Sequence, residues 1–210
     1  MPMPPVYERQ LDSDTRWALS EGSRHFEEKS AVHMALREIS RQLDAHGIPY
    51  AIVGGMAMFL HGYRRFTEDV DVLVTKDGLK QAHDNLVGRG YIPAFEGSKN
   101  LRDTIHGVRV EFLITGGFPG DGKPKPVSFP NPDDSFIDKE GLRVVPLPKL
   151  IELKLASGLS NAARVKDLGD VQELIRHLNL QSSFADELDP SVRDKYLELW
   201  SALQQEPHDP

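Results

Sequence analysis

Two aspartates separated by a single valine, Asp69 and Asp71, are the first residues whose type and spacing could do chemistry. On a strand, residues two apart point to the same face, so these carboxylates would lie side by side. They would repel each other unless a cation lay between them, and Mg²⁺ takes oxygen ligands at about 2.0–2.1 Å. Pairs of such ions promote displacement at phosphorus. The pair therefore predicts a divalent-metal site, and a solvated strand of alternating polarity is the alternative.

Gly54 and Gly55 lie upstream of the acids, directly after a short apolar segment. Without side chains, they would let a phosphate approach the backbone, and the start of a helix favours anions. The two glycines therefore predict a nucleotide-binding turn. A tight strand-to-helix connection is the alternative.

Glu111 interrupts the apolar segment 108–114. An acid within such a strand is costly to bury without a partner. Beside Asp69 and Asp71 it could hold a metal ion or act as a general base. The alternative is an ion pair with Arg109 that faces solvent.

A basic residue, Lys154, stands in the otherwise apolar helical pattern of residues 147–157. In the following segment, 162–178, Asp167 and Asp170 are three residues apart and would share one face of a helix. Lys154 could reach a triphosphate or pair with an acid of the neighbouring helix. Ordinary charge on a helix surface is the alternative.

The elements that must position these residues follow from the hydrophobic periodicity. Helices are predicted over residues 23–46, 56–60, 79–87, 147–157, 162–178 and 191–203, and strands over 50–53, 70–74 and 108–114. Strands and helices alternate in the front half, whereas the back half is helical. We therefore predict an α/β (α+β) fold in which helices flank a small mixed sheet.

The same pattern predicts four parts of the chain. Residues 1–22 form a loose N-terminal segment, 23–145 a catalytic core, 146–204 a helical C-terminal subdomain and 205–210 a tail. Within the core, residues 116–132 are rich in proline and glycine and are expected to form a long irregular loop. The run from Gly117 to Lys123 imitates a phosphate-binding loop, but Pro124 stands where a hydroxyl is required.

The composition is that of an ordinary globular protein, with 210 residues, 39% hydrophobic and 27% charged. A net charge of −7 disfavours tight, non-specific binding of nucleic acid. The chain contains no cysteine, which excludes disulfides, thiolate metal sites and a cysteine nucleophile. With no apolar run near the roughly 20 residues that span a bilayer, we expect a cytoplasmic protein with no membrane contact.

Taken together, these residues resemble the nucleotidyltransferase superfamily related to DNA polymerase beta. Its pattern is a glycine pair, a spacer, two acids separated by a hydrophobic residue, and a third acid on a later strand. Here the spacer between Gly55 and Asp69 has 13 residues, and Arg65 and Thr67 match a common approach to the acids. The later segment, with Lys154 followed by residues 164–170, resembles the AbiEii-type branch, which includes toxins of toxin–antitoxin systems.

The resemblance implies that an NMP is moved from an NTP to an RNA (such as tRNA), protein or small-molecule acceptor. Asp69 and Asp71 would bind Mg²⁺ or Mn²⁺, and Glu111 would be the third carboxylate, where many relatives have aspartate. An antitoxin partner is also implied. The residues expected to bind the nucleotide are Gly54, Gly55, Arg65, Thr67, Lys154, Asp167 and Asp170.

Two other functions are compatible with the same acids. A glycosyltransferase can use an acid-x-acid motif to hold a metal and a nucleotide sugar, although it needs neither the glycine pair nor the lysine helix. A regulatory or binding protein could keep the fold without catalysis. The retained acids argue against this second alternative.

Overall fold

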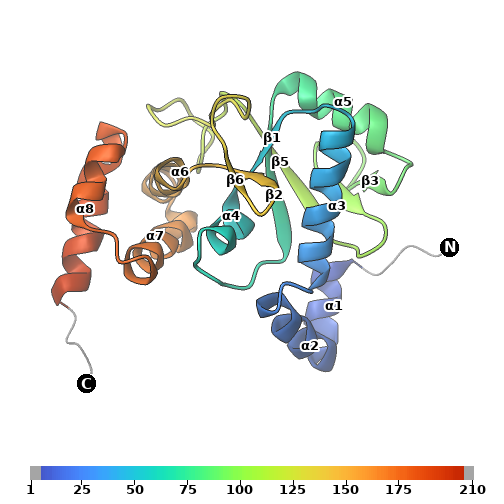
Figure 1. Cartoon of the computed structure of the whole chain (residues 1–210), viewed down its shortest axis with the longest axis horizontal. Coiled ribbons are helices and arrows are strands. Elements are labelled where there is room, and N and C mark those ends of the chain that lie inside the picture. Colours follow the sequence, from blue (N-terminus) through green and yellow to red (C-terminus); the bar gives the residue numbers. More distant parts are fainter. Residues whose placement is uncertain (1–5, 206–210) are drawn as a thin grey trace.

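The computed structural model describes residues 6–205 as one mixed sheet surrounded by helices (Figure 1). The predicted tail lies outside the described residues, except for Gln205 at the end of the last helix. No helix in residues 6–205 combines the length and apolar character needed to cross a membrane.

The described strands form one seven-stranded sheet with the order β3-β4-β5-β2-β1-β7-β6. Strand β2 is parallel to β5 and antiparallel to β1, and β1 is in turn parallel to β7. The sheet is mixed, which confirms the predicted fold class. The strands are β1 (Tyr50–Ile52), β2 (Asp69–Val74), β3 (Tyr91–Pro93), β4 (Leu101–Asp103), β5 (Arg109–Ile114), β6 (Ile137–Lys139) and β7 (Leu142–Val144).

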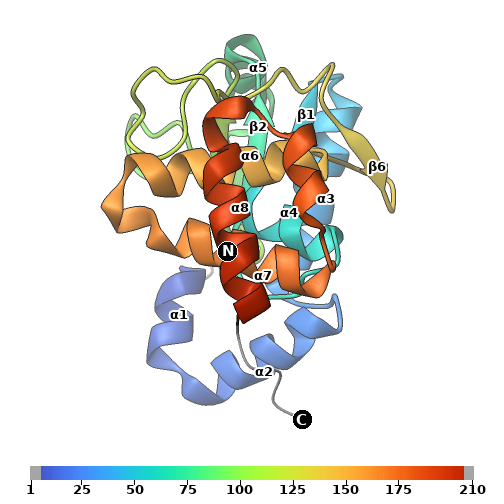
Figure 2. The same ribbon diagram turned by 90° about the vertical axis from the view of Figure 1, so that its left-hand side faces the viewer.

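Helices surround this sheet. Helices α6, α7 and α8 gather at one end of the molecule, and α1 and α2 lie on the side opposite α5 (Figures 1 and 2). The α-helices are α1 (Tyr7–Ser13), α2 (Thr15–Phe26), α3 (Ala31–Ala45), α4 (Gly54–Leu60), α5 (Lys76–Leu86), α6 (Leu147–Ser160), α7 (Val165–His177) and α8 (Pro190–Gln205). Two 3-10 helices, η1 (Ala162–Arg164) and η2 (Ser182–Glu187), connect the C-terminal helices.

Strand β2 has two unlike faces, as its alternating sequence predicts. Val70, Val72 and Val74 are fully buried, and α3 and α5 contact this strand. Asp69 and Asp71 are only partly buried and, by the two-residue repeat, lie on the opposite face. The hydrophobic core therefore anchors the strand that presents the acids.

The prediction of a loose N-terminal segment is wrong for the described residues from Tyr7 onward. The Tyr7 ring is fully buried, its backbone N–H donates to the Gly107 carbonyl at 3.3 Å, and its hydroxyl donates to the buried Glu21 carboxylate at 3.3 Å. The Asp14 side chain accepts a hydrogen bond from Trp17 N and caps α2. The buried Tyr7 and its contacts therefore fix a segment that was expected to be loose.

The helix predicted over residues 23–46 is interrupted. Helix α2 ends at Phe26, Glu28 takes a positive φ of 62°, and α3 begins at Ala31 with Ser30 as its N-cap. The apolar periodicity runs across this break, because both helices present apolar faces to the core. Pattern alone therefore joined two helices into one.

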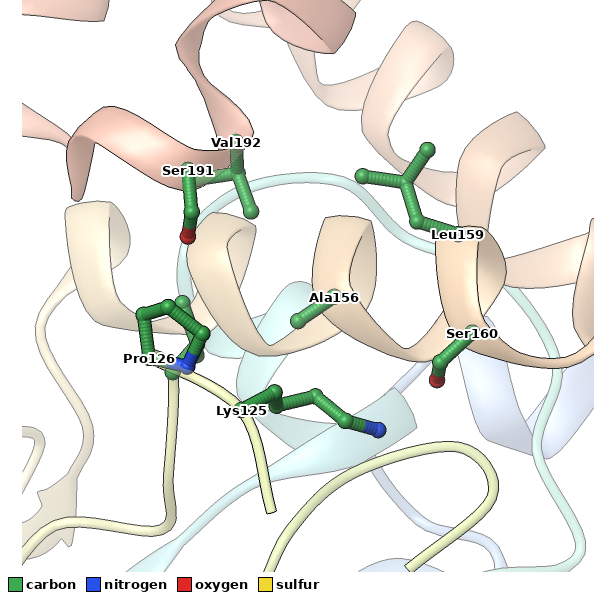
Figure 3. A pocket seen from close by; sticks show the side chains of 8 residues that line it. Lys125, Pro126, Ala156, Leu159, Ser160, Ser191 and Val192 are labelled. Atoms are coloured by element: carbon green, nitrogen blue, oxygen red, sulfur yellow. The ribbon is translucent and has the colours of Figure 1, made fainter. Parts of the chain in front are cut away.

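Residues 116–132 form no helix or strand, as expected, and lie against α6. A Cβ at Gly120 would be 2.1 Å from the Ser160 Oγ, so this glycine permits the close approach. The loop, α6 and the start of α8 line an open, mostly apolar pocket of about 210 Å³. Figure 3 shows Lys125 and Pro126 on one side of it and Ala156 and Ser160 on the other. The Lys125 ammonium is engaged within the loop, since it donates to the Pro119 carbonyl and to Asp121.

Candidate active site

Three predicted carboxylates, those of Asp69, Asp71 and Glu111, come together on the adjacent strands β2 and β5. The parallel register places Asp71 opposite Glu111 and Asp69 opposite Arg109. One oxygen from each acid lies within 4.8 Å of the others, and all three residues are partly buried. This acid triad is the only group of potential metal-ligating side chains found among residues 6–205.

Within the acid triad, the carboxyl of Asp71 has a strongly shifted pKa. Burial raises the pKa of its carboxyl to about 7, and the charges of Asp69 and Glu111 add to that rise. The positive charges of Lys154 and Arg109 act in the opposite direction. The negative charge of the triad is therefore only partly balanced by the side chains around it.

The two glycines lie directly against these acids. Gly54 adopts a positive φ of 61°, and a Cβ at this position would be 1.7 Å from the Asp71 Oδ2. At Gly55 a Cβ would be 2.6 Å from the Thr67 Oγ1. The Thr67 hydroxyl in turn donates to Asp69 Oδ1 at 3.2 Å. Only glycine fits at position 54, which explains one part of the motif by conformation and space.

Arg109 lies close to Glu111, as the alternative interpretation of Glu111 as an ion-pair partner expected. Its Nη2 donates to Asp69 Oδ2 at 2.9 Å and lies 3.6 Å from Glu111 Oε2. The predicted ion pair with Glu111 therefore exists, but it forms inside the acid triad. Both interpretations of Glu111 describe the same cluster.

The second set of predicted residues forms a buried network between α6 and α7. Lys154 Nζ donates to Asp170 Oδ2 at 2.6 Å and to Asp167 Oδ1 at 3.2 Å. Ser157 and Arg164 both donate to Asp167 Oδ2. Lys154, Asp167 and Asp170 are 7%, 6% and 5% exposed, so this is an interior network rather than surface charge.

Arg65 connects this network to the loop that precedes the acids. Its Nη2 donates to Asp170 Oδ2 at 3.1 Å, and its Nε lies 3.0 Å from Asp170 Oδ1. Two residues further along, Thr67 contacts Asp69. The chain from α7 through Arg65 to Asp69 thus fixes the approach to β2.

The donor set fits a small divalent cation. Three carboxylates supply hard oxygen ligands of the kind that Mg²⁺ and Mn²⁺ prefer. Within the described residues, one guanidinium, that of Arg109, is paired directly with them. A divalent ion at Asp69 and Asp71 would relieve the repulsion that adds to the effect of burial on the pKa of Asp71.

Comparison with known proteins identifies the fold. ANT(2'')-Ia, in complex with adenylyl-2''-tobramycin, is 11% identical, with a TM-score of 0.50 over 81% of this chain and 97% of that chain. The chain has a nucleotidyltransferase-like fold. No family model matches its sequence, and no curated protein matches it either.

Two further solved structures are similar at lower TM-scores. An antigenic nucleotidyltransferase-like protein from Paracoccidioides brasiliensis is 18% identical, with a TM-score of 0.49 over 82% of this chain and 86% of that chain. JHP933 from Helicobacter pylori is 18% identical, with a TM-score of 0.46 over 82% of this chain and 89% of that chain.

Two residues beside the acid triad were missed as parts of the site. Arg109 had a usable signal, since it lies two residues before Glu111 on the same strand and so shares its face. Glu8, on α1, lies 4.0 Å from the Arg109 Nε and had no signal, because its segment was expected to be loose.

Proposed function

We propose that this chain is a metal-dependent nucleotidyltransferase that moves an NMP from an NTP to an acceptor hydroxyl or phosphate. The acid triad carries the proposal, because three carboxylates crowd one position of a nucleotidyltransferase-like sheet with a single arginine paired to them. A divalent ion held there would neutralise charge on the triphosphate and on the oxygens of the displacement.

Glu111 and the two glycines would provide proton transfer and triphosphate binding. Glu111, whose side chain is 32% exposed against 22% for Asp69, would accept the proton of the acceptor hydroxyl. The acceptor oxygen then bonds to the α-phosphorus, and the bond to the bridging oxygen breaks, releasing pyrophosphate. Gly54 and Gly55 would let the triphosphate approach the backbone next to Asp71, whose carboxylate packs directly against Gly54.

Lys154 would place a positive charge near the nucleotide. Its ammonium is held by Asp167 and Asp170, and its charge lowers the pKa of Asp71. Arg65 and Thr67 would complete the nucleotide site by fixing the loop that leads to Asp69. The roles of these residues follow from their positions around the acid triad.

The decisive experiment incubates the full chain with each α-labelled NTP, Mg²⁺ and one of three acceptor pools. The pools are total tRNA, cell proteins and small hydroxyl compounds, the last because ANT(2'')-Ia is found with adenylyl-2''-tobramycin. We expect label in one pool, loss of label with EDTA, and at least a roughly hundredfold loss in Asp69→Asn. Turnover of a nucleotide sugar, with no labelled product from any NTP, would instead establish the glycosyltransferase alternative.

We further propose the AbiEii-type branch and a toxin role with an antitoxin partner, on the pattern of Lys154 and residues 164–170. We place the reaction in the cytoplasm, where NTPs are made. Induced expression in a bacterial host should arrest growth with the wild-type chain and not with Asp69→Asn. Equal growth of the two strains, at equal protein levels, would remove the toxin role while leaving the transferase activity to the labelling assay.

A further inference from the structure

Arg109 occupies a position beside the acid triad where a divalent cation would bind. Its guanidinium donates to Asp69 Oδ2 at 2.9 Å and lies 3.6 Å from Glu111 Oε2. A divalent ion bound to Asp69 would compete for the same carboxylate and would repel the guanidinium. Arg109 therefore has to give up at least part of its contact when the ion binds.

A second acceptor for Arg109 is already in position. Glu8 Oε1 on α1 lies 4.0 Å from the Arg109 Nε, and this Nε is buried without a hydrogen-bond partner in the described part of the chain. Arg102 holds the Glu8 carboxylate in place through its Nη1 at 2.8 Å and its Nη2 at 3.4 Å. A small rotation of Arg109 would turn the near contact with Glu8 into a hydrogen bond.

We infer that Arg109 is a positioning residue that leaves Asp69 for Glu8 when a divalent cation binds the acid triad. The inference rests on the proposed function, because it takes Asp69 as a metal ligand. Arg109 thus screens the acids before the ion arrives and is neutralised by Glu8 afterwards. Helix α1, anchored by the buried Tyr7, becomes part of the metal site without contributing a ligand.

The test is Mn²⁺ binding measured by isothermal titration calorimetry in the absence of nucleotide. Arg109→Gln removes the competitor, so we expect affinity to rise by roughly tenfold. Glu8→Gln removes the alternative partner, so we expect affinity to fall by roughly three- to tenfold. Combined with Arg109→Gln, Glu8→Gln should have almost no further effect, because the two residues act through one contact.

Asp12→Asn is the matched control. Asp12 is an exposed acid on the same helix, and its charge helps to raise the pKa of Glu68, so it lies near the site. A fall in affinity for Asp12→Asn equal to that for Glu8→Gln would show a general charge effect and overturn the exchange. The exchange is also overturned if Glu8→Gln weakens binding equally with and without Arg109. The comparison of Glu8→Gln with Asp12→Asn carries the test alone if Arg109→Gln does not fold.

Asp69→Asn separates the exchange from the proposed function. If the wild-type chain binds Mn²⁺ and Asp69→Asn does not, the metal site stands, and unchanged affinities in Arg109→Gln and Glu8→Gln would defeat only the exchange. If neither wild type nor Asp69→Asn binds Mn²⁺, the metal site itself fails, and the exchange fails with it.

Discussion

The acid triad and the Lys154 network use the same residue types with opposite charge balance. In the triad, three partly exposed carboxylates share one guanidinium, that of Arg109. In the network, the buried carboxylates of Asp167 and Asp170 are paired with Lys154 and with two arginines, Arg65 and Arg164. In the network, three cations more than balance two carboxylates, whereas the triad is short of positive charge.

This difference in charge predicts different responses of the two clusters to substitution and to added cations. Charges buried in a balanced network hold each other's geometry, and removing one leaves its partners uncompensated. Carboxylates left unbalanced at a partly open position instead favour an incoming cation. Three substitutions test this contrast through their effects on the free energy of unfolding.

The largest effect is expected from Lys154→Met in the network. The substitution removes the shared ammonium and leaves Asp167 and Asp170 with one arginine each, so it should lower the free energy of unfolding by about 3 kcal/mol. Urea denaturation at pH 7 without metal measures the change. Lys195→Met is the control, since Lys195 pairs with the exposed Glu198 and should cost at most about 1 kcal/mol. Equal losses for the two lysines would show that the network adds nothing to stability.

The balanced network also had the weaker signal in the sequence. Helical spacing placed Asp167 and Asp170 on one face, but pairing with Lys154 was one option among three. The choice depends on how α6 and α7 pack, which local pattern does not encode. The shared face of Asp69 and Asp71 was easier to predict from the sequence. The two-residue repeat of a strand is local, and Val70 and Val72 mark the buried face.

The rest of the acid triad depended on long-range pairing. Glu111 joins Asp71 only because β2 and β5 are adjacent and parallel, and the paired positions are 40 apart in the sequence. The three-residue strands β3, β4, β6 and β7 were missed for the same reason, since pairing rather than propensity makes them strands. Glu8 could not be predicted as part of the site, because its segment was expected to be loose. The burial of Tyr7 holds that segment against the rest of the chain.

Asp167→Asn should lower the free energy of unfolding by an intermediate amount, and this loss should depend on pH. Burial alone would raise the pKa of Asp167, but Lys154, Ser157 and Arg164 outweigh it and hold the pKa below 3.8. A folded-state pKa below the unfolded value gives stability that is present above about pH 4 and is lost as pH falls through the folded-state value. We therefore expect the variant to cost about 1–3 kcal/mol at pH 7, with the difference from wild type shrinking below about pH 4.

Urea denaturation at a series of pH values from 7 to 2.5 measures that difference. The exposed Asp133 provides the control, since Asp133→Asn should shift stability slightly and by the same amount at each pH. If the cost of Asp167→Asn stayed constant down to pH 2.5, the carboxylate charge of Asp167 would not be what holds the network together.

The smallest effect, and the only one of opposite sign, is expected from Asp71→Asn. Removing one of three crowded negative charges should raise the metal-free stability by on the order of 1 kcal/mol. Adding Mg²⁺ should reverse the order. A wild-type chain with Mg²⁺ at about 100 times its Kd gains about 2.7 kcal/mol, and Asp71→Asn should gain almost nothing. Thermal unfolding with EDTA and then with Mg²⁺ measures both states.

The sign is what makes this last experiment informative. A residue that stabilises the fold loses stability on substitution, as Lys154 should, whereas substitution of a ligand for a cation should raise the stability of the metal-free chain. Loss of stability in Asp71→Asn without metal, together with no response of the wild type to Mg²⁺, would place the acid triad in the same structural class as the network. The opposite pair of results can arise only if the fold tolerates the crowding of Asp69, Asp71 and Glu111 and a cation relieves it.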